Sequence, residues 1–332
     1  MPAQAVSSDP SVPTIRLRLP ATSANLGPGF DTLGLALSLY LNVEAEQSDA
    51  FHIQATGRDA NLCASLSNNL ILMTYTEVLG HQGLAAPTLA LRLENEIPLG
   101  MGCGSSAAAL LAGVLLANHF GQLRWSPQQI LDEACNREGH PDNVAACFYG
   151  GMTASSTVQT QSVDPEASVI AATFGRDLKW RLLLALPTTS LATSQARALL
   201  PDRYTRADAV GNVQATALLV SAFAQDRPGL LAHAMRDRLH QPFRSNACPL
   251  LPALLPLTGT HGILGVALSG AGPSVLLIVD PETPLPPIHQ AIYSAAGGHL
   301  AEILTLAIGQ AASIQVSHRP CRNQPVTTQN VT

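Results

Sequence analysis

Lysine and aromatic residues are scarce in this chain of 332 residues, and charged residues are few. Lys179 is the only lysine among 18 basic residues, 4% of the residues are aromatic and 12% are charged. Because 23 residues are acidic, the formal net charge is −5 at pH 7. An acidic chain without a lysine-rich segment lacks the electrostatic attraction that nucleic acid and anionic membranes require. We therefore expect neither as a partner.

Cysteine pairs and long apolar runs are also lacking. The six cysteines are widely spaced, without a CxxC pair or histidines at metal-binding spacing, which is typical of free thiols in a reducing compartment. The longest apolar run, residues 107–117, is about half of the roughly 20 residues that a membrane span needs. Residues 1–13 carry no basic residue ahead of an apolar stretch, which is typical of a flexible tail and not of a signal peptide. We expect a soluble, cytoplasmic protein.

Apolar residues are abundant, at 46% of the chain, and the length predicts two globular domains. The polar stretch 155–168 has no apolar period and is the best candidate for the boundary between them. We therefore expect an N-terminal domain over residues 14–160, a C-terminal domain over 169–318 and a second flexible tail over 319–332.

The spacing of apolar residues predicts strands with helices between them in both halves, which indicates an α+β fold. Strands are predicted over residues 15–19, 35–43, 89–93, 180–186, 262–268, 275–279 and 314–316. Helices are predicted over residues 69–79, 105–118, 126–137, 210–220, 228–240 and 288–307. A glycine-rich loop is expected between the first two strands, and a β-β-α-β ending after residue 262.

The most informative segment is a glycine loop, Pro98 to Ala109, with the sequence PLGMGCGSSAAA. It follows a predicted strand and opens into a predicted helix, so the free N–H groups of the first helical turn can bind an anion such as a polyphosphate. No lysine is near, which excludes a Walker A loop, and the spacing of a dinucleotide-binding loop is absent. The alternative is a glycine string that only lets a helix pack closely on a sheet.

Three further segments combine glycines with polar side chains. Asn25 and Asp31 flank a Gly-Pro-Gly bend within residues 20–34, residues 138–143 read Glu-Gly-His-Pro-Asp-Asn, and residues 268–274 form a glycine-rich turn. An acid, an imidazole and an Asp-Asn pair within six residues suit a metal ligand and substrate contacts. Taken singly, each segment also fits an ordinary turn or loop.

Together these segments resemble the motifs of the GHMP kinases, named for galactokinase, homoserine kinase, mevalonate kinase and phosphomevalonate kinase. The resemblance covers roughly residues 14–318. Residues 20–34, 138–143 and the later string from Asp237 to Arg244 are most similar to the homoserine kinase branch. The resemblance implies a two-domain fold with the active site in the cleft between the domains. It also implies transfer of a phosphoryl group from ATP to the side-chain hydroxyl of L-homoserine, giving O-phospho-L-homoserine in threonine biosynthesis.

The resemblance also implies site residues, with ATP and Mg²⁺ as cofactors. The residues implied for ATP are Asn69 near the base and Pro98, Leu99, Gly100, Met101, Gly102, Cys103, Gly104, Ser105, Ser106 and Ala107 around the phosphates. Ser106 and Glu138 are the implied Mg²⁺ ligands, with Glu133 as the alternative acid. The residues implied for the substrate are Asn25, Asp31, His140, Asn143, Thr193, Arg197, Arg244 and Gly270. The implied catalytic residues are Asn143, Glu138 and Ser106.

The charge of the substrate supports part of this assignment. Homoserine is a zwitterion, so its pocket needs an acid for the ammonium and a guanidinium for the carboxylate. Asp31 matches the first need, and Arg197 and Arg244 match the second. A mevalonate-type substrate would leave Asp31 without a cationic partner.

Several alternatives stay open at this point. Another small-molecule GHMP kinase of the mevalonate or sugar type, or a ligand-binding regulator that has lost catalysis on the same fold, would carry similar motifs. A general base is optional in phosphoryl transfer. The resemblance favours Asn143 over Asp142 at the reacting position. A homodimer is compatible with the sequence.

Overall fold

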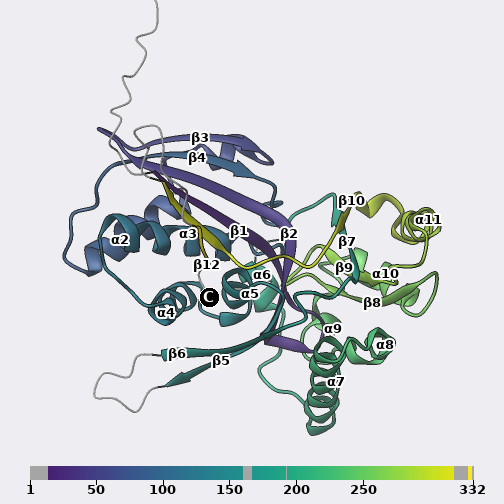
Figure 1. The fold of residues 1–332 in the computed structure, drawn as a ribbon. Helices are drawn as coiled ribbons and strands as arrows, with labels where there is room; N and C mark the ends of the chain where they lie inside the picture. Colours follow the sequence, from purple (N-terminus) through teal and green to yellow (C-terminus); the bar gives the residue numbers. More distant parts are fainter. Residues whose placement is uncertain (1–13, 160–166, 192, 318–327, 331–332) are drawn as a thin grey trace, which may run out of the picture.

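The computed structural model describes residues 14–159, 167–191, 193–317 and 328–330 (Figure 1). The strands are β1 (Thr14–Asn25), β2 (Gly29–Gln47), β3 (His52–Gly57), β4 (Leu89–Asn95), β5 (Met152–Gln159), β6 (Ala167–Phe174), β7 (Arg181–Pro187), β8 (Ile263–Leu268), β9 (Val275–Val279), β10 (Leu300–Leu306), β11 (Ser313–Ser317) and β12 (Thr328–Asn330). The α-helices are α1 (Ala60–Cys63), α2 (Leu70–His81), α3 (Ser105–Phe120), α4 (Pro127–Glu138), α5 (Pro141–Tyr149), α6 (Thr193–Ala198), α7 (Arg206–Ala224), α8 (Leu231–Ala234), α9 (Gln241–Arg244), α10 (Leu250–Leu254) and α11 (Leu285–Ala296). Short 3-10 helices are η1 (Pro228–Leu230), η2 (Leu255–Leu257) and η3 (Gly297–His299).

The first sheet is built around the long strand β2. Its strand order is β12-β11-β1-β2-β4-β3. In addition, β5 pairs with another part of β2, and β6 pairs with β5. Residues 33–35 of β2 pair with β5, whereas residues 41–47 pair with β4, so one strand serves two neighbours. Helices α3 and α5 pack against β1 and β2, and α4 contacts β6. In Figure 1 these helices accordingly lie between the main strands and the β5–β6 hairpin.

The second sheet is antiparallel, with the order β10-β7-β9-β8. Strand β7 is buried on both faces, and its side chains alternate between two apolar cores as the two-residue period of a strand requires. Leu182 and Leu184 belong to the large core that also holds the first sheet, whereas Leu183 and Ala185 belong to a smaller core that includes residues of α10 and α11. The two halves of the chain therefore share one apolar core.

The ending of the chain differs from the sequence-based prediction. Helix α11 ends at Ala296, and β10 occupies the second half of the helix predicted over residues 288–307. Gly297 has φ 55° and stops the helix, because a left-handed backbone is accessible to glycine but breaks α geometry. The β-β-α-β ending therefore closes with β10. The strand predicted over 314–316 is β11, which pairs with β1 in the first sheet.

The helix predicted over residues 228–240 is also wrong beyond its first turns. Residues 228–234 form η1 and α8, and a turn then leads into α9. After α8 ends at Ala234, the carboxylate of Asp237 accepts the backbone N–H groups of Leu239, His240 and Gln241, and these bonds stabilise a turn in place of further helix.

The first predicted loop and the predicted boundary need correction as well. Strand β1 runs on to Asn25 and β2 begins at Gly29, so most of the loop expected before residue 35 is strand. Of the polar stretch 155–168, residues 155–159 belong to β5 and residues 167–168 to β6, both in the first sheet, and the chain passes to the second sheet only between Phe174 and Arg181. The predicted tail 319–332 contains β12, which pairs with β11. The predicted tail 1–13 lies outside the described residues.

Within the part of the chain described, no helix combines the length and the apolarity that crossing a bilayer would take.

Candidate active site

A cavity of about 290 Å³ lies where the two halves meet. Its walls come from the β1–β2 turn, the glycine loop, the α4–α5 connection and the C-terminal half of the chain. The lining residues implied for ATP, metal or substrate by the sequence are Asn25, Asp31, Gly100, Gly102, Cys103, Gly104, Ser105, Ser106, Glu138, His140, Asn143, Arg197, Arg244 and Gly270. The fold thus brings into one cavity residues that are more than 200 positions apart in the sequence.

The glycine loop opens into α3 without a side-chain cap. Gly104 is the N-cap at φ 68°, and none of the side chains that the structure describes accepts the first N–H groups of the helix. These donors and the positive end of the helix dipole therefore remain for an anion. A side chain at Gly104 would collide with Thr22 Oγ1, and one at Gly102 with the backbone of Ser269. The glycines are needed because residues of the segments 20–34 and 268–274 pack directly on the loop.

A second cavity, of about 310 Å³, adjoins the first through Ser105 and Ser106. Its walls are largely apolar, which suits a purine ring. Asn69 lines this cavity, but its side chain already accepts Leu72 N–H at 3.2 Å and donates to the Cys63 carbonyl at 3.1 Å. The implied residue Leu99 lines the second cavity as well. The other implied loop residues, Pro98, Met101 and Ala107, line neither cavity.

Ser106 and Glu138 form an oxygen pair beside the loop. The Ser106 hydroxyl donates to Glu138 Oε2 at 2.8 Å. Burial raises the pKa of Glu138, and the hydrogen bond from Ser106 and the charge of His140 offset this only in part. Glu133 instead forms an ion pair with Arg137 at 2.6 Å and lines neither cavity. A hydroxyl and a carboxylate are ligands that fit Mg²⁺, and Glu138 is the acid that stands beside Ser106.

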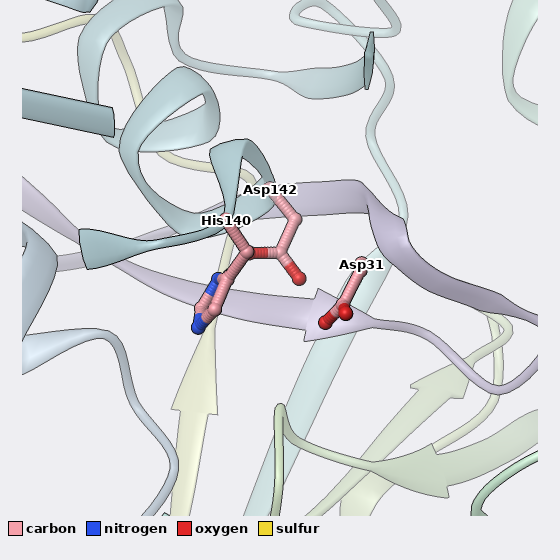
Figure 2. A group of neighbouring side chains, drawn as sticks. All are labelled: Asp31, His140 and Asp142. Carbon is pink, nitrogen blue, oxygen red and sulfur yellow. The ribbon is translucent and has the colours of Figure 1, made fainter. Parts of the chain in front are cut away.

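The α4–α5 connection carries a network around Asp142. Asp142 Oδ1 lies 2.6 Å from His140 Nδ1 and accepts the Asn143 backbone N–H at 2.7 Å. Burial opposes the charged form of His140, but the hydrogen bond to Asp142 and the nearby acids raise its pKa above the usual 6.5. Asp31 also lies near, and the ligand atoms of Asp31, His140 and Asp142 fall within 4.8 Å of one another (Figure 2). Asp142 is 2% exposed, so its carboxylate chiefly holds the connection in place.

Asp31 and Arg197 form a two-pronged ion pair across the cavity. Arg197 Nη1 and Nη2 donate to the two Asp31 oxygens at 3.0 and 2.8 Å. The two side chains are 33% and 47% exposed, and a surface pair of this kind contributes at most about 1 kcal/mol. The two groups implied for opposite ends of a zwitterion therefore pair with each other and can separate at low cost.

Arg244 differs from Arg197 in that it is buried, at 2% exposure. Its Nε donates to the Ala196 carbonyl at 3.1 Å and its Nη1 contacts His240 Nδ1 at 3.0 Å. Among the described residues no carboxylate forms an ion pair with it, and burial, followed by the charge of Arg197, lowers its pKa. A guanidinium in this position is a strong indication of a bound anion, because an unpaired buried charge is unfavourable.

Two implied substrate ligands are already engaged by the protein. The Asn25 amide donates to the Gly270 carbonyl at 2.9 Å and accepts Asp31 N–H at 3.0 Å, so Asn25 braces the turn that presents Asp31. Gly270 in turn donates its N–H to Ala24 at 3.1 Å. The side chain of Thr193 lies outside the described residues.

Three residues of the site were not singled out from the sequence. The ring of Phe30 lies below the guanidinium groups of both Arg197 and Arg244, at 5.5 and 5.6 Å. Thr22 Oγ1 donates to Asn143 Oδ1 at 2.7 Å, and His240 contacts Arg244. The sequence signal that could have identified these residues is their position. Thr22 and Phe30 lie in the segment 20–34, and His240 lies in the string from Asp237 to Arg244.

Comparison with known proteins identifies two family domains in this chain. Residues 69–151 match the GHMP kinases N-terminal domain, and residues 219–297 match the GHMP kinases C-terminal domain. Homoserine kinase from Solibacter usitatus is 45% identical over 80% of this chain and 84% of its own length. Homoserine kinase from Deinococcus radiodurans is 36% identical over 86% of this chain and 91% of its own length.

Solved structures agree with this relationship. The crystal structure of homoserine kinase from Cytophaga hutchinsonii superimposes with a TM-score of 0.72 at 25% identity, covering 95% of this chain and 99% of that one. Mevalonate kinase from L. major shares the fold at 14% identity with a TM-score of 0.65, covering 88% of this chain and 95% of that one. The expected two-domain α+β fold is confirmed, and the chain belongs to the GHMP kinase family, in its homoserine kinase branch.

Proposed function

We propose that this protein is an ATP-dependent homoserine kinase that phosphorylates the side-chain hydroxyl of L-homoserine. The observation that carries the proposal is one cavity in which the uncapped glycine loop faces Arg244 and the Asp31–Arg197 pair. A phosphate cradle and two groups suited to a zwitterion are what this reaction needs. In the reaction the bond from the γ-phosphorus to the bridging oxygen of ADP breaks, a bond to the homoserine oxygen forms, and the hydroxyl proton is released.

ATP fits the two adjoining cavities in one orientation. The base occupies the largely apolar second cavity beside Asn69, and the phosphates lie on the first turn of α3 at Ser105 and Ser106. The backbone N–H groups there neutralise charge that develops on the transferred group, and such fixed donors supply much of the stabilisation in phosphoryl transfer.

Ser106 and Glu138 would hold Mg²⁺. When bound, this ion supplies positive charge to the phosphate oxygens of ATP. The protein's own contribution is to keep a hydroxyl and a carboxylate 2.8 Å apart, beside the helix that receives the phosphates. Coordination of a cation favours the ionised form of Glu138, which burial alone disfavours.

Homoserine would replace the protein's internal ion pair with its own charges. Its ammonium binds Asp31, and its carboxylate binds Arg197 together with the buried Arg244. The exchange is inexpensive because the exposed Asp31–Arg197 pair contributes little, while Arg244 gains the anion that it lacks.

Asn143 would orient the reacting hydroxyl. Its Oδ1 already accepts the Thr22 hydroxyl at 2.7 Å, and its Nδ2 donates one hydrogen to Asp142 Oδ1 at 3.4 Å, which leaves the second Nδ2 hydrogen for the substrate. An amide N–H can donate to the hydroxyl oxygen but cannot take up its proton. The proposal is therefore direct transfer without a carboxylate base at this position.

The function is tested by a coupled ADP-release assay with Mg·ATP across homoserine, mevalonate, galactose and shikimate. We expect turnover with homoserine to exceed that with the other acceptors by at least about 10²-fold, because only homoserine offers both charges to Asp31 and Arg244. Comparable turnover with mevalonate would overturn the substrate assignment. The cytoplasmic location and the homodimer stay predictions, which cell fractionation and light scattering of the purified protein would check.

The arginine assignment leads to a further prediction. We expect Arg197→Leu and Arg244→Leu each to raise the KM for homoserine by roughly 10- to 100-fold, because a hydrogen bond to a charged group contributes roughly 1.5–3 kcal/mol. The KM for ATP should change little. Arg238→Leu is the matched control, since Arg238 is an exposed arginine that pairs with Asp208 at 3.6 Å outside the cavity. If the KM for ATP rose instead, these arginines would belong to the phosphates.

A further inference from the structure

His240 is a fully buried histidine that joins two parts of the substrate site. Its Nε2 lies 2.8 Å from the carbonyl oxygen of Gly27, in the β1–β2 turn that presents Asp31. Its Nδ1 lies 3.0 Å from Arg244 Nη1, and its ring stacks on Phe30 with the centroids 5.4 Å apart. The ring itself does not line the cavity, so it reaches the substrate only through these neighbours.

The partners of His240 determine which nitrogen carries the proton. A guanidinium N–H can only donate, so Nδ1 must be the acceptor for Arg244. A carbonyl oxygen can only accept, so Nε2 must carry the hydrogen and donate it to Gly27. One neutral tautomer satisfies both contacts, and the protonated form would set an N–H against the N–H of Arg244.

The charges around His240 favour the same state. Burial lowers the pKa of His240, the Asp237 carboxylate at 3.5 Å from Nε2 opposes this, and the Arg244 charge lowers it again. The charge of Asp31 raises the pKa of His240, as the charge of Asp237 does. The net direction is toward the neutral ring that the two hydrogen bonds require.

Resting on the proposed function, we propose that His240 is a positioning residue for homoserine: it anchors Arg244 through Nδ1 and ties that anchor to the Gly27 turn through Nε2. Arg244 has a second anchor at the Ala196 carbonyl, and the two anchors together fix the guanidinium plane. The remaining N–H groups on its outer nitrogens are then directed to the substrate carboxylate. Without the Nδ1 acceptor the guanidinium would keep its charge and lose its orientation.

Two amide substitutions separate the two contacts. The oxygen of Asn lies near the position of Nδ1 and can still accept from Arg244, whereas the amide of Gln reaches the position of Nε2 and can still donate to Gly27. We expect His240→Gln to raise the KM for homoserine about tenfold and His240→Asn to raise it no more than about threefold. The KM for ATP and kcat should stay within about twofold in both variants.

A homoserine analogue without the carboxylate shows whether the effect passes through Arg244. We expect the inhibition constant of 3-aminopropan-1-ol to be the same in the wild type and His240→Gln. Two results would overturn the proposal: an equal change in the KM for homoserine in both variants, or a loss of affinity for 3-aminopropan-1-ol in His240→Gln as large as the loss for homoserine. Either result would mean that His240 only fills space under Phe30. If His240→Gln fails to fold, His240→Leu, which fills a similar volume but lacks both contacts, replaces it with the same expectation. Wild-type enzyme that does not phosphorylate homoserine would refute the proposed function itself, a result separate from any difference between the variants.

Discussion

Glu138→Gln is expected to lower kcat by about 10²- to 10³-fold at saturating ATP, while the protein keeps its fold. The substitution preserves the shape of the side chain and the oxygen that accepts from Ser106, but it removes the negative charge that a divalent cation needs. The Mg²⁺ concentration for half-maximal rate should rise as well. The measurements are steady-state rates over a Mg²⁺ titration, with thermal unfolding to verify the fold.

Glu133→Gln is the matched control for this experiment, since both acids lie on α4. Glu133 pairs with Arg137 outside the cavity, so we expect its substitution to change kcat by no more than about twofold. Ser106→Ala should resemble Glu138→Gln, and the double variant should lose little more than either single variant, because groups that act as a unit are not additive. A strong effect at Glu133 with a weak one at Glu138 would reverse the assignment of the metal ligand.

The choice between these two acids shows what the sequence could and could not predict. Glu133 and Glu138 are five residues apart on one helix, so their side chains point about 140° apart, and only one of them can face Ser106. The sequence predicts the helix, because Ser126 and Pro127 form a strong start signal and the structure contains the full capping box. It does not predict which face of that helix meets α3, because tertiary packing decides that.

The glycine loop was predictable because its chemistry is local. A strand, alternating glycines and two serines at a helix start predict an open helix N-terminus suited to an anion without reference to distant residues, and Gly104 is the N-cap of α3 with no side-chain hydrogen bond among the described residues. The ion pair between Asp31 and Arg197 was not predictable, although the resemblance implies both residues as substrate ligands. They are 166 positions apart in the sequence, the segment between them contributes strands to both sheets, and the shared core brings them together.

The wrong helix over residues 288–307 has a different cause. Its second half, LAEILTL in β10, combines apolar residues at spacings that fit either a helix or a strand in a short window. Pairing with β7 decides the outcome, and the glycines at 297 and 298 mark the break. Context that far away in the sequence is not visible in local periodicity.

The last prediction concerns the proton of the reacting hydroxyl. Asp142→Asn is expected to retain kcat within about tenfold, whereas Asn143→Leu should lose about 10²-fold or more through misplacement of the acceptor. Asp142 uses Oδ1 to hold His140 and the Asn143 backbone, and an amide oxygen can take over both contacts. Asn143 has its own support from Thr22, so Thr22→Val should reproduce part of the loss while the side chain of Asn143 is intact.

The measurement that separates the two residues is single-turnover phosphoryl transfer followed against pH in the wild type and the three variants. A carboxylate base at position 142 would give an acidic limb that disappears in Asp142→Asn, with a loss of about 10³-fold or more, since general base catalysis contributes roughly 10²- to 10⁴-fold. That result would overturn direct transfer. The buried carboxylate argues against it, because an Asp142 that took the proton would have to weaken the hydrogen bonds that hold His140 and Asn143 in place. A base in this site would therefore disturb the positioning of the acceptor at the moment of transfer, whereas the proposed direct transfer, with Asn143 and the loop donors holding the reacting groups, would need no rearrangement of this network.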